Sequence, residues 1–143
     1  MKYDKLFMAL LGASAAHGEA SRQIFKDYGL TESQPKILYI LDFNEGIIQK
    51  DFAQLCSIKP STMTVQLTRL EKEGLIRREI CYVSGGKKAY KIYLTQRGKE
   101  IADSLIERID KLEEICFRGF TEDERNQLLS LLERVETNTT TLI

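Results

Sequence analysis

The side chains best suited to contact nucleic acid gather between Pro60 and Gly74, where short hydroxyls, a valine and two cations share one side of an expected helix. Hydroxyls can hydrogen-bond base edges, a valine methyl can pack against thymine, and arginine can bind guanine or a phosphate. Lysine attracts phosphates without regard to sequence. The residues of this face are Ser61, Thr62, Thr64, Val65, Thr68, Arg69 and Lys72. The alternative is an ordinary amphipathic helix with a solvated face, so the neighbouring elements must decide.

Residue types that usually perform catalysis or hold metal are sparse. His17 is the single histidine, and the sequence identifies neither the nucleophile nor the orienting group that a catalytic base needs. Cys56, Cys81 and Cys116 are odd in number and far apart, which fits neither a metal site nor a disulfide set. We therefore expect no enzyme, no metal and no cofactor, and a reduced, cytoplasmic setting.

One redox hypothesis stays open. Cys56 and Cys116 fall on apolar helix faces, so both are expected to be buried. Cys81 lies on an expected strand near Arg77 and Arg78, and neighbouring cations can lower the pKa of a thiol. Oxidant sensing by a cysteine is therefore an alternative to simple DNA recognition.

The helix that carries the polar face has clear limits. Pro60 suits a first helical turn, and Gly74 suits the position just after a helix end. Met63, Leu67 and Leu70 recur at helical spacing and predict one buried stripe.

Two more helices are expected before it. Residues 31–34 form a capping-box pattern that opens the first of them. The second spans about residues 49–56 and is joined by a tight connection to the polar helix, which predicts a helix-turn-helix unit. The side chains expected to face inward are Ile37, Leu38, Ile40 and Leu41 in the first, and Phe52, Ala53 and Leu55 in the second.

A basic β-hairpin is expected directly after Gly74. Residues 75–83 and 88–94 have the alternation of strands, and Gly85 and Gly86 allow the positive φ of a tight turn. A hairpin after a recognition helix is a wing. We expect Arg77, Arg78, Lys87 and Lys88 to bind phosphates, with the last two at or in the adjacent minor groove; the alternative is a solubilised tip.

Long helices are expected on both sides of this unit. Residues 2–28 form one, which Gly12 or Gly18 could bend and which Gly29 ends. Thr95 caps another, and residues 121–124 form a capping box before a last helix whose end, at residues 138–141, is expected to fray. The apolar positions are Leu6, Leu10 and Leu11 in the first, Ile101, Leu105, Ile109, Leu112 and Cys116 in the next, and Leu128, Leu129, Leu131, Leu132 and Val135 in the last. The apolar surface of the last helix is too broad for a lone C-terminal helix.

Length and charge are consistent with this arrangement. A chain of 143 residues with zero net charge predicts a single domain. Residues 59–99 hold ten Lys/Arg against three acids, whereas residues 100–143 hold five against eleven. A basic middle region and an acidic end fit a chain that meets a polyanion with one region and itself with another. The N-terminus has some features of a signal peptide, but its apolar run is short and follows Asp4, and no stretch approaches a membrane span.

Taken together, these residues resemble the MarR family of bacterial transcription regulators. The resemblance rests on residues 61–77, on the glycine-tipped hairpin, and on Tyr93-Leu94-Thr95-Gln96-Arg97-Gly98. Residues 29–31, Gln34 and residues 37–38 also match, so the similarity covers nearly the whole chain. It implies a mainly α fold with a small β wing, namely a winged helix-turn-helix with N- and C-terminal dimerisation helices.

The resemblance also implies how such a protein works. Residues 1–30 and 96–143 would be dimerisation helices, and residues 31–95 the DNA-binding lobe. The homodimer would bind double-stranded DNA at a pseudo-palindromic operator and repress transcription until a small, aromatic effector binds. Effector-pocket candidates are Phe7, Leu10, Leu11, His17, Tyr39 and Phe43. The alternative is a winged-helix module that binds protein instead of DNA.

The hairpin departs from the family pattern at one point. The wing of the family usually carries an Asp-x-Arg pair, and the corresponding residues here are Gly86 and Lys88. The ion pair is therefore absent, which predicts a more mobile wing or a shifted tip. Lysine is also a poorer reader of a narrow minor groove than arginine.

Overall fold

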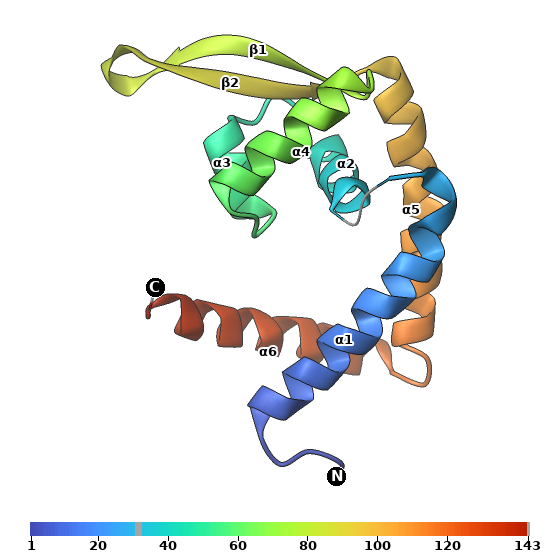
Figure 1. The fold of residues 1–143 in the computed structure, drawn as a ribbon. Helices are drawn as coiled ribbons and strands as arrows, with labels where there is room; N and C mark the ends of the chain where they lie inside the picture. Colours follow the sequence, from blue (N-terminus) through green and yellow to red (C-terminus); the bar gives the residue numbers. More distant parts are fainter. Residues whose placement is uncertain (31–32, 143) are drawn as a thin grey trace.

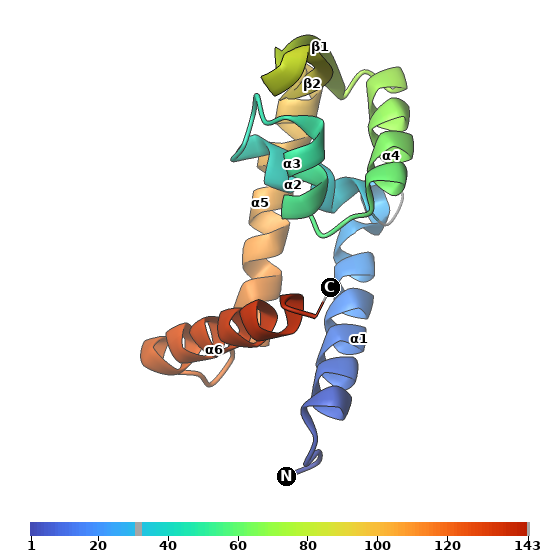
Figure 2. The same ribbon diagram turned by 90° about the vertical axis from the view of Figure 1, so that its left-hand side faces the viewer.

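The structure is a computed structural model that describes residues 1–30 and 33–142. Helices α2, α3 and α4 and a hairpin form a lobe, from which α5 extends with α1 beside it, while α6 lies at the far end of α5 (Figures 1 and 2). The elements are α1 (Leu6–Phe25), η1 (Lys26–Tyr28), α2 (Gln34–Asp42), α3 (Gln49–Leu55), α4 (Pro60–Lys72), β1 (Ile76–Val83), η2 (Ser84–Gly86), β2 (Lys87–Leu94), α5 (Gln96–Cys116) and α6 (Glu122–Thr140).

The lobe closes around a hydrophobic core. Met63, Leu67 and Leu70 of α4 are fully buried, which confirms the predicted stripe and turns the opposite, polar face of the helix outward. The core also takes side chains from α2, α3, the base of the hairpin and the first half of α5: Ile37, Leu38, Leu41, Phe52, Ile76, Ile92, Ala102 and Leu105.

The hairpin forms as predicted, with small shifts at its strand ends. β1 and β2 pair antiparallel from Ile76↔Leu94 to Val83↔Lys87. Gly85 and Gly86 have φ of 80° and 72°, so the turn uses the conformation that favours glycine. An isolated bridge joins Ile48 to Lys91 and adds a third, short piece of extended chain to the sheet.

The hairpin leads into α5 through a compact joint. Thr95 caps α5 as predicted, because its Oγ1 accepts from the Gly98 amide at 3.1 Å. The same hydroxyl donates to the Gly74 carbonyl at 2.6 Å, just after α4. A Cβ added at Gly98 would lie 1.9 Å from the Leu75 carbonyl oxygen, so only glycine allows this approach.

The first helix differs from the prediction at its start. It begins at Leu6 rather than at residue 2, because Lys5 is extended and offers no capping side chain. Tyr3 instead packs over Gly12, with its hydroxyl oxygen 3.0 Å from the place that a Cβ would occupy. The helix continues through Gly12 and ends, after a 3₁₀ turn, at left-handed Gly29.

Two residues expected to be buried are exposed. Leu55 is 50% exposed, whereas Cys56, the C-cap residue of α3, is buried in the core as predicted. Cys116 is exposed because the last turns of α5 extend past the lobe. The capping residues Thr31 and Glu32 lie outside the described residues; α2 begins at Gln34, with Pro35 buried in its first turn.

Neither α1 nor α6 buries a single described side chain. The Thr121–Glu124 capping box of α6 is confirmed, and the helix runs to Thr140 instead of fraying at residue 138. In Figure 2 the two helices project separately below the lobe. Their large exposed apolar residues are Leu6, Phe7, Met8, Leu10, Leu11, Leu128, Leu129, Leu131 and Leu132. This set is called the apolar arm surface below.

Candidate nucleic-acid interface

The predicted polar face of α4 lies outward along its whole length. All seven of its residues are exposed, namely Ser61, Thr62, Thr64, Val65, Thr68, Arg69 and Lys72. α4 lies on the outer side of the lobe, with α2 and α3 behind it (Figure 2). Nothing in the described structure covers this face, so a duplex groove could reach it.

Hydrogen bonds within the protein define what two of the hydroxyls can offer. Thr64 Oγ1 donates to the Pro60 carbonyl at 3.0 Å and accepts from Gln49 Nε2 at 3.1 Å. Thr68 Oγ1 donates to the Thr64 carbonyl at 2.8 Å. Thr68 therefore presents its lone pairs, which suits the amino group of cytosine or adenine, whereas Thr64 is held by α3.

The cations of the predicted interface fall into two groups. Arg69 and Lys72 make no ion pair with any residue in the described part of the chain. Arg77 is paired with Glu79 and stacks on Tyr93, with its Cζ 4.3 Å from the ring centroid. Arg78 is paired with Glu71 of α4 at 3.0 Å and is largely covered. The Arg78 hydrogen bond holds the pKa of Glu71 below its usual value.

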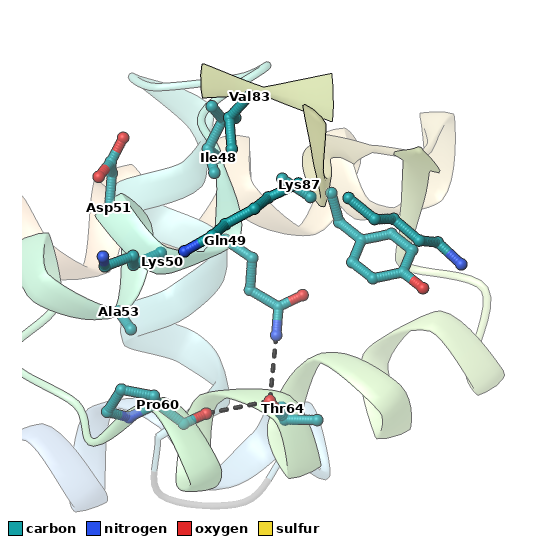
Figure 3. A pocket seen from close by; sticks show the side chains of 12 residues that line it. Ile48, Gln49, Lys50, Asp51, Ala53, Pro60, Thr64, Val83 and Lys87 are labelled. Carbon is teal, nitrogen blue, oxygen red and sulfur yellow. Dashed lines mark hydrogen bonds between the residues drawn. The ribbon is translucent and has the colours of Figure 1, made fainter. Parts of the chain in front are cut away.

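A groove separates α4 from the wing. Its volume is about 530 Å³, and α3, α4 and β2 line it (Figure 3). Its charged lining residues are Lys50 and Asp51 from the start of α3 and Lys87 and Lys88 from the wing, so cations outnumber acids, and Gln49 and Thr64 lie below. Gln49 and Lys50 are not evident as site residues from the sequence, since nothing in the spacing of residues 49–64 shows that Gln49 meets Thr64.

A second cavity of about 660 Å³ lies where α1, α2 and α5 meet. Of the six predicted effector residues it brings together two, His17 and Tyr39. Phe43 packs edge-on against the Tyr39 ring at a centroid distance of 5.3 Å but is not part of the lining. Phe7, Leu10 and Leu11 lie further along α1, on the apolar arm surface. The cavity also contains side chains the sequence did not indicate: Arg22, Phe25, Lys26, Lys36, Ile109 and Glu113.

The cysteines are all free. Burial raises the pKa of the Cys56 thiol to about 11, so Cys56 is protonated at neutral pH and is a poor nucleophile. Among the described residues no group of three or more histidines, cysteines and acids could hold a metal ion. Within the same residues, no helix has the length and apolar character needed to cross a bilayer.

A helix-turn-helix with an exposed second helix, followed directly by a basic hairpin, defines a winged-helix DNA-binding protein. A sequence model of the MarR family matches residues 30–82. The homoprotocatechuate degradative operon repressor of Escherichia coli is 33% identical over 132 residues, which are 92% of this chain and 87% of that protein. The Bacillus subtilis HTH-type transcriptional regulator YybA is 31% identical over 80% of this chain and 75% of its own length.

Solved structures agree. A MarR family transcriptional regulator from Listeria monocytogenes, complexed with 26mer DNA, superposes with a TM-score of 0.84 at 26% identity, over 95% of this chain and 89% of that one. The chain belongs to the MarR family and is a DNA-binding transcriptional regulator with a winged helix. Its relatives are regulators, not enzymes.

Proposed function

We propose that this regulator is a homodimeric repressor that binds a pseudo-palindromic operator and is released by a small anionic aromatic effector. The observation that carries the proposal is the apolar arm surface. α1 and α6 expose a row of large apolar side chains and bury none, although each helix is about 20 residues long. Apolar surface of this extent on a small protein marks an interface.

A second copy of the chain is the proposed cover of that surface. Residues 1–30 and 96–143 would then form the dimer and residues 31–95 the two DNA-binding lobes. A twofold dimer would present two α4 helices to successive major grooves, about 34–36 Å apart along the duplex. Ser61, Thr62 and Val65 would meet base edges, with Arg69 at a guanine or a phosphate. Lys72, Lys87 and Lys88 would bind phosphates, joined by Lys50 at the edge of the groove.

The ion pairs of Arg77 and Arg78 modify the predicted phosphate contacts. A guanidinium already paired with a carboxylate contributes less net charge to the interface. We therefore assign the main phosphate attraction to the unpaired lysines, and to Arg77 and Arg78 the positioning of the wing against α4.

The cavity between α1, α2 and α5 is the proposed effector site. Tyr39 and Phe25 supply aromatic contacts, while Lys26 and Lys36 favour an anion; the other two charged side chains of the lining are paired, Arg22 with Glu19 and Glu113 with Arg125. One relative is named for the degradation of homoprotocatechuate, an aromatic carboxylate, and this cavity suits that chemical class. An effector bound here would favour one separation or tilt of the two lobes of the dimer, and so change operator affinity.

Binding across a salt series tests the DNA-binding part. The purified protein is titrated with the DNA upstream of its own gene and with the same DNA scrambled, while light scattering reports its mass. We expect a dimer, preference for the natural DNA, and a log–log salt slope that reports the phosphate contacts. A monomer that binds both duplexes equally would contradict the proposal.

Two substitutions separate base reading from phosphate binding. Arg69→Ala should cost about 1–3 kcal/mol for each half-site of the operator and little on scrambled DNA, whereas Lys87→Ala should weaken both alike and lower the salt slope by about one for each wing. An operator affinity unchanged by Arg69→Ala would refute the assigned reading face. Homoprotocatechuate added to the complex tests the effector class, with its uncharged methyl ester as the control and Lys36→Gln as the variant expected to respond less.

Repeating the titration with and without peroxide tests the oxidant-sensing alternative. Cys81 and Cys116 are the accessible thiols, and Cys116→Ser and Cys81→Ser would show which one responds. Loss of binding on oxidation, reversed by reductant, would favour that alternative.

A further inference from the structure

The wing exposes two apolar side chains that the proposed phosphate contacts do not use. Ile80 is 56% exposed and Tyr82 is 73% exposed, both on β1. The strand register places them opposite Tyr90 and Lys88 of β2, respectively. Since side chains alternate between the faces of a strand, all four lie on the same face of the hairpin.

This face is turned toward the recognition helix. Arg78 shares it, two residues before Ile80, and reaches Glu71 of α4. Two cations lie over the Tyr90 ring, with Arg78 Cζ and Lys88 Nζ each 5.5 Å from its centroid. The face is thus a strip that starts at α4 and ends, near the hairpin tip, in Tyr82 and Lys88. It continues the surface on which α4 would meet DNA.

We propose that Ile80 and Tyr82 form the minor-groove contact of the wing, in place of an arginine near the hairpin tip, where this chain has Gly86 and Lys88. The inference rests on the proposed mode of DNA binding and deepens it. Apolar side chains are used in minor grooves against the sugar walls and between base steps. Lys88, directly across from Tyr82, would bind a phosphate at the groove edge.

The chemistry gives this contact a base preference. Guanine places an amino group in the minor groove, where an A·T pair presents only acceptors and leaves the floor open. An apolar side chain pressed against that floor cannot hydrogen-bond the amino group and meets it as a steric and desolvation cost. The wing therefore selects A·T pairs beside each half-site, because they avoid the steric and desolvation costs of the guanine amino group. This preference requires no hydrogen bond to a base.

DNA is a better occupant of this strip than a protein partner. Tyr82 lies directly opposite Lys88, and Lys87 is the next residue toward the tip, so a polyanion satisfies both parts of the surface. When α4 lies in the major groove of the DNA, the adjoining minor groove of the same duplex would lie under the wing. A partner protein would have to compete with that duplex for the same strip.

Inosine substitution provides the experiment. The protein first selects its site from a random DNA pool, and the base pairs flanking each half-site, under the wing, are then changed from A·T to G·C or to I·C. Inosine lacks the minor-groove amino group but shows the major-groove pattern of guanine. We expect G·C to weaken binding about tenfold, within the cost typical of one mismatched pair, and I·C to be tolerated.

Variants connect that preference to the residues. Tyr82→Ala should lower affinity for the A·T flanks and bind G·C and A·T flanks alike, whereas Tyr82→Phe should behave as wild type. Lys88→Ala should lower the salt slope and keep the flank preference; Lys91→Ala, on the opposite face of the hairpin, is its matched control and should lower the slope less. Thermal unfolding confirms that each variant folds.

The outcomes distinguish this inference from the proposed function. Equal loss on G·C and I·C would mean major-groove reading and would overturn the inference. The same holds if Tyr82→Ala retains the flank preference, a result that would leave the strip to a protein partner. Selection of no DNA sequence at all would overturn the proposed operator binding along with it.

Discussion

The DNA-binding lobe and the two helices α1 and α6 differ in how they are stabilised. The lobe turns the apolar sides of α2, α3, α4 and the hairpin onto one another, so its fold follows from its own sequence. α1 and α6 have comparable apolar residues but no described partner that covers them. Hydrophobic burial dominates folding, so the lobe is complete as one chain, whereas α1 and α6 leave apolar surface that the proposed second copy would cover.

Charged substitutions on the apolar arm surface should change assembly and DNA binding far more than charged substitutions on the surface of the lobe. Leu129→Glu/Leu132→Glu places two carboxylates in the proposed dimer interface. We expect a monomer by light scattering, and an operator affinity lower by about 10²–10⁴-fold because the two half-sites are no longer bound together. Leu55→Glu is the matched control, since Leu55 is similarly exposed but lies on the lobe, and it should leave the dimer intact. A double variant that stays dimeric would show that α6 does not form the interface.

A truncation in the lobe core should act on folding itself. Leu67 is fully buried on the inner face of α4, so Leu67→Ala should lower the free energy of unfolding by about 2–5 kcal/mol. Urea denaturation at several protein concentrations measures it. Leu55→Ala should cost less than about 0.5 kcal/mol. Equal losses for the two would mean that the lobe is not packed as described.

The joint between lobe and arm should be the least tolerant glycine position. Gly98→Ala places a methyl group against the Leu75 carbonyl, and the shift it forces should cost about 1–3 kcal/mol. Gly18→Ala is the opposite case, because the added Cβ meets nothing closer than Arg22 Nη1 at 3.8 Å within α1. It should stabilise the protein by about 0.5–1 kcal/mol, measured as a rise in Tm. A neutral Gly98→Ala would contradict the close approach.

The smallest effect should come from the ion pair that ties the wing to α4. Arg78 lowers the pKa of Glu71, so the pair stabilises the folded state above the usual pKa of a glutamate and loses that effect as pH falls through the lowered value. Glu71→Gln should make stability fall less steeply between about pH 5 and pH 3, by an amount within the 0–1 kcal/mol of exposed pairs. Identical slopes for wild type and Glu71→Gln would mean that the pair adds nothing.

The sequence predicted the elements of the lobe because each has a local signal. The stripe of Met63, Leu67 and Leu70 requires one face of α4 to be buried, and Pro60 and Gly74 mark its ends. The hairpin was predictable from the strand-like alternation of residues 75–83 and 88–94 and from the turn glycines Gly85 and Gly86. Burial at the end of α3 was harder to predict, since Leu55 is exposed and Cys56 is buried, because the orientation of the turn after α3 depends on tertiary packing.

The candidate sites were less predictable. The polar face of α4 could be assigned from one helix, but the pairing of Arg78 with Glu71 joins different elements and has no local signal. The cavity lining likewise depends on how α1 crosses α2 and α5, which helical spacing does not determine. For that reason, only His17 and Tyr39 of the six predicted effector residues line it.

The Thr95 hydroxyl bears on the spacing between the two half-sites that the proposed dimer can bind. It donates to the carbonyl after α4 and accepts from the first turn of α5, so the recognition helix and α5 share a fixed rotational phase. One base pair added between half-sites turns the second one by about 34–36° around the duplex axis. In the proposed dimer this joint cannot swing to follow that turn, so half-site spacing would be read through Thr95 even though it touches no base.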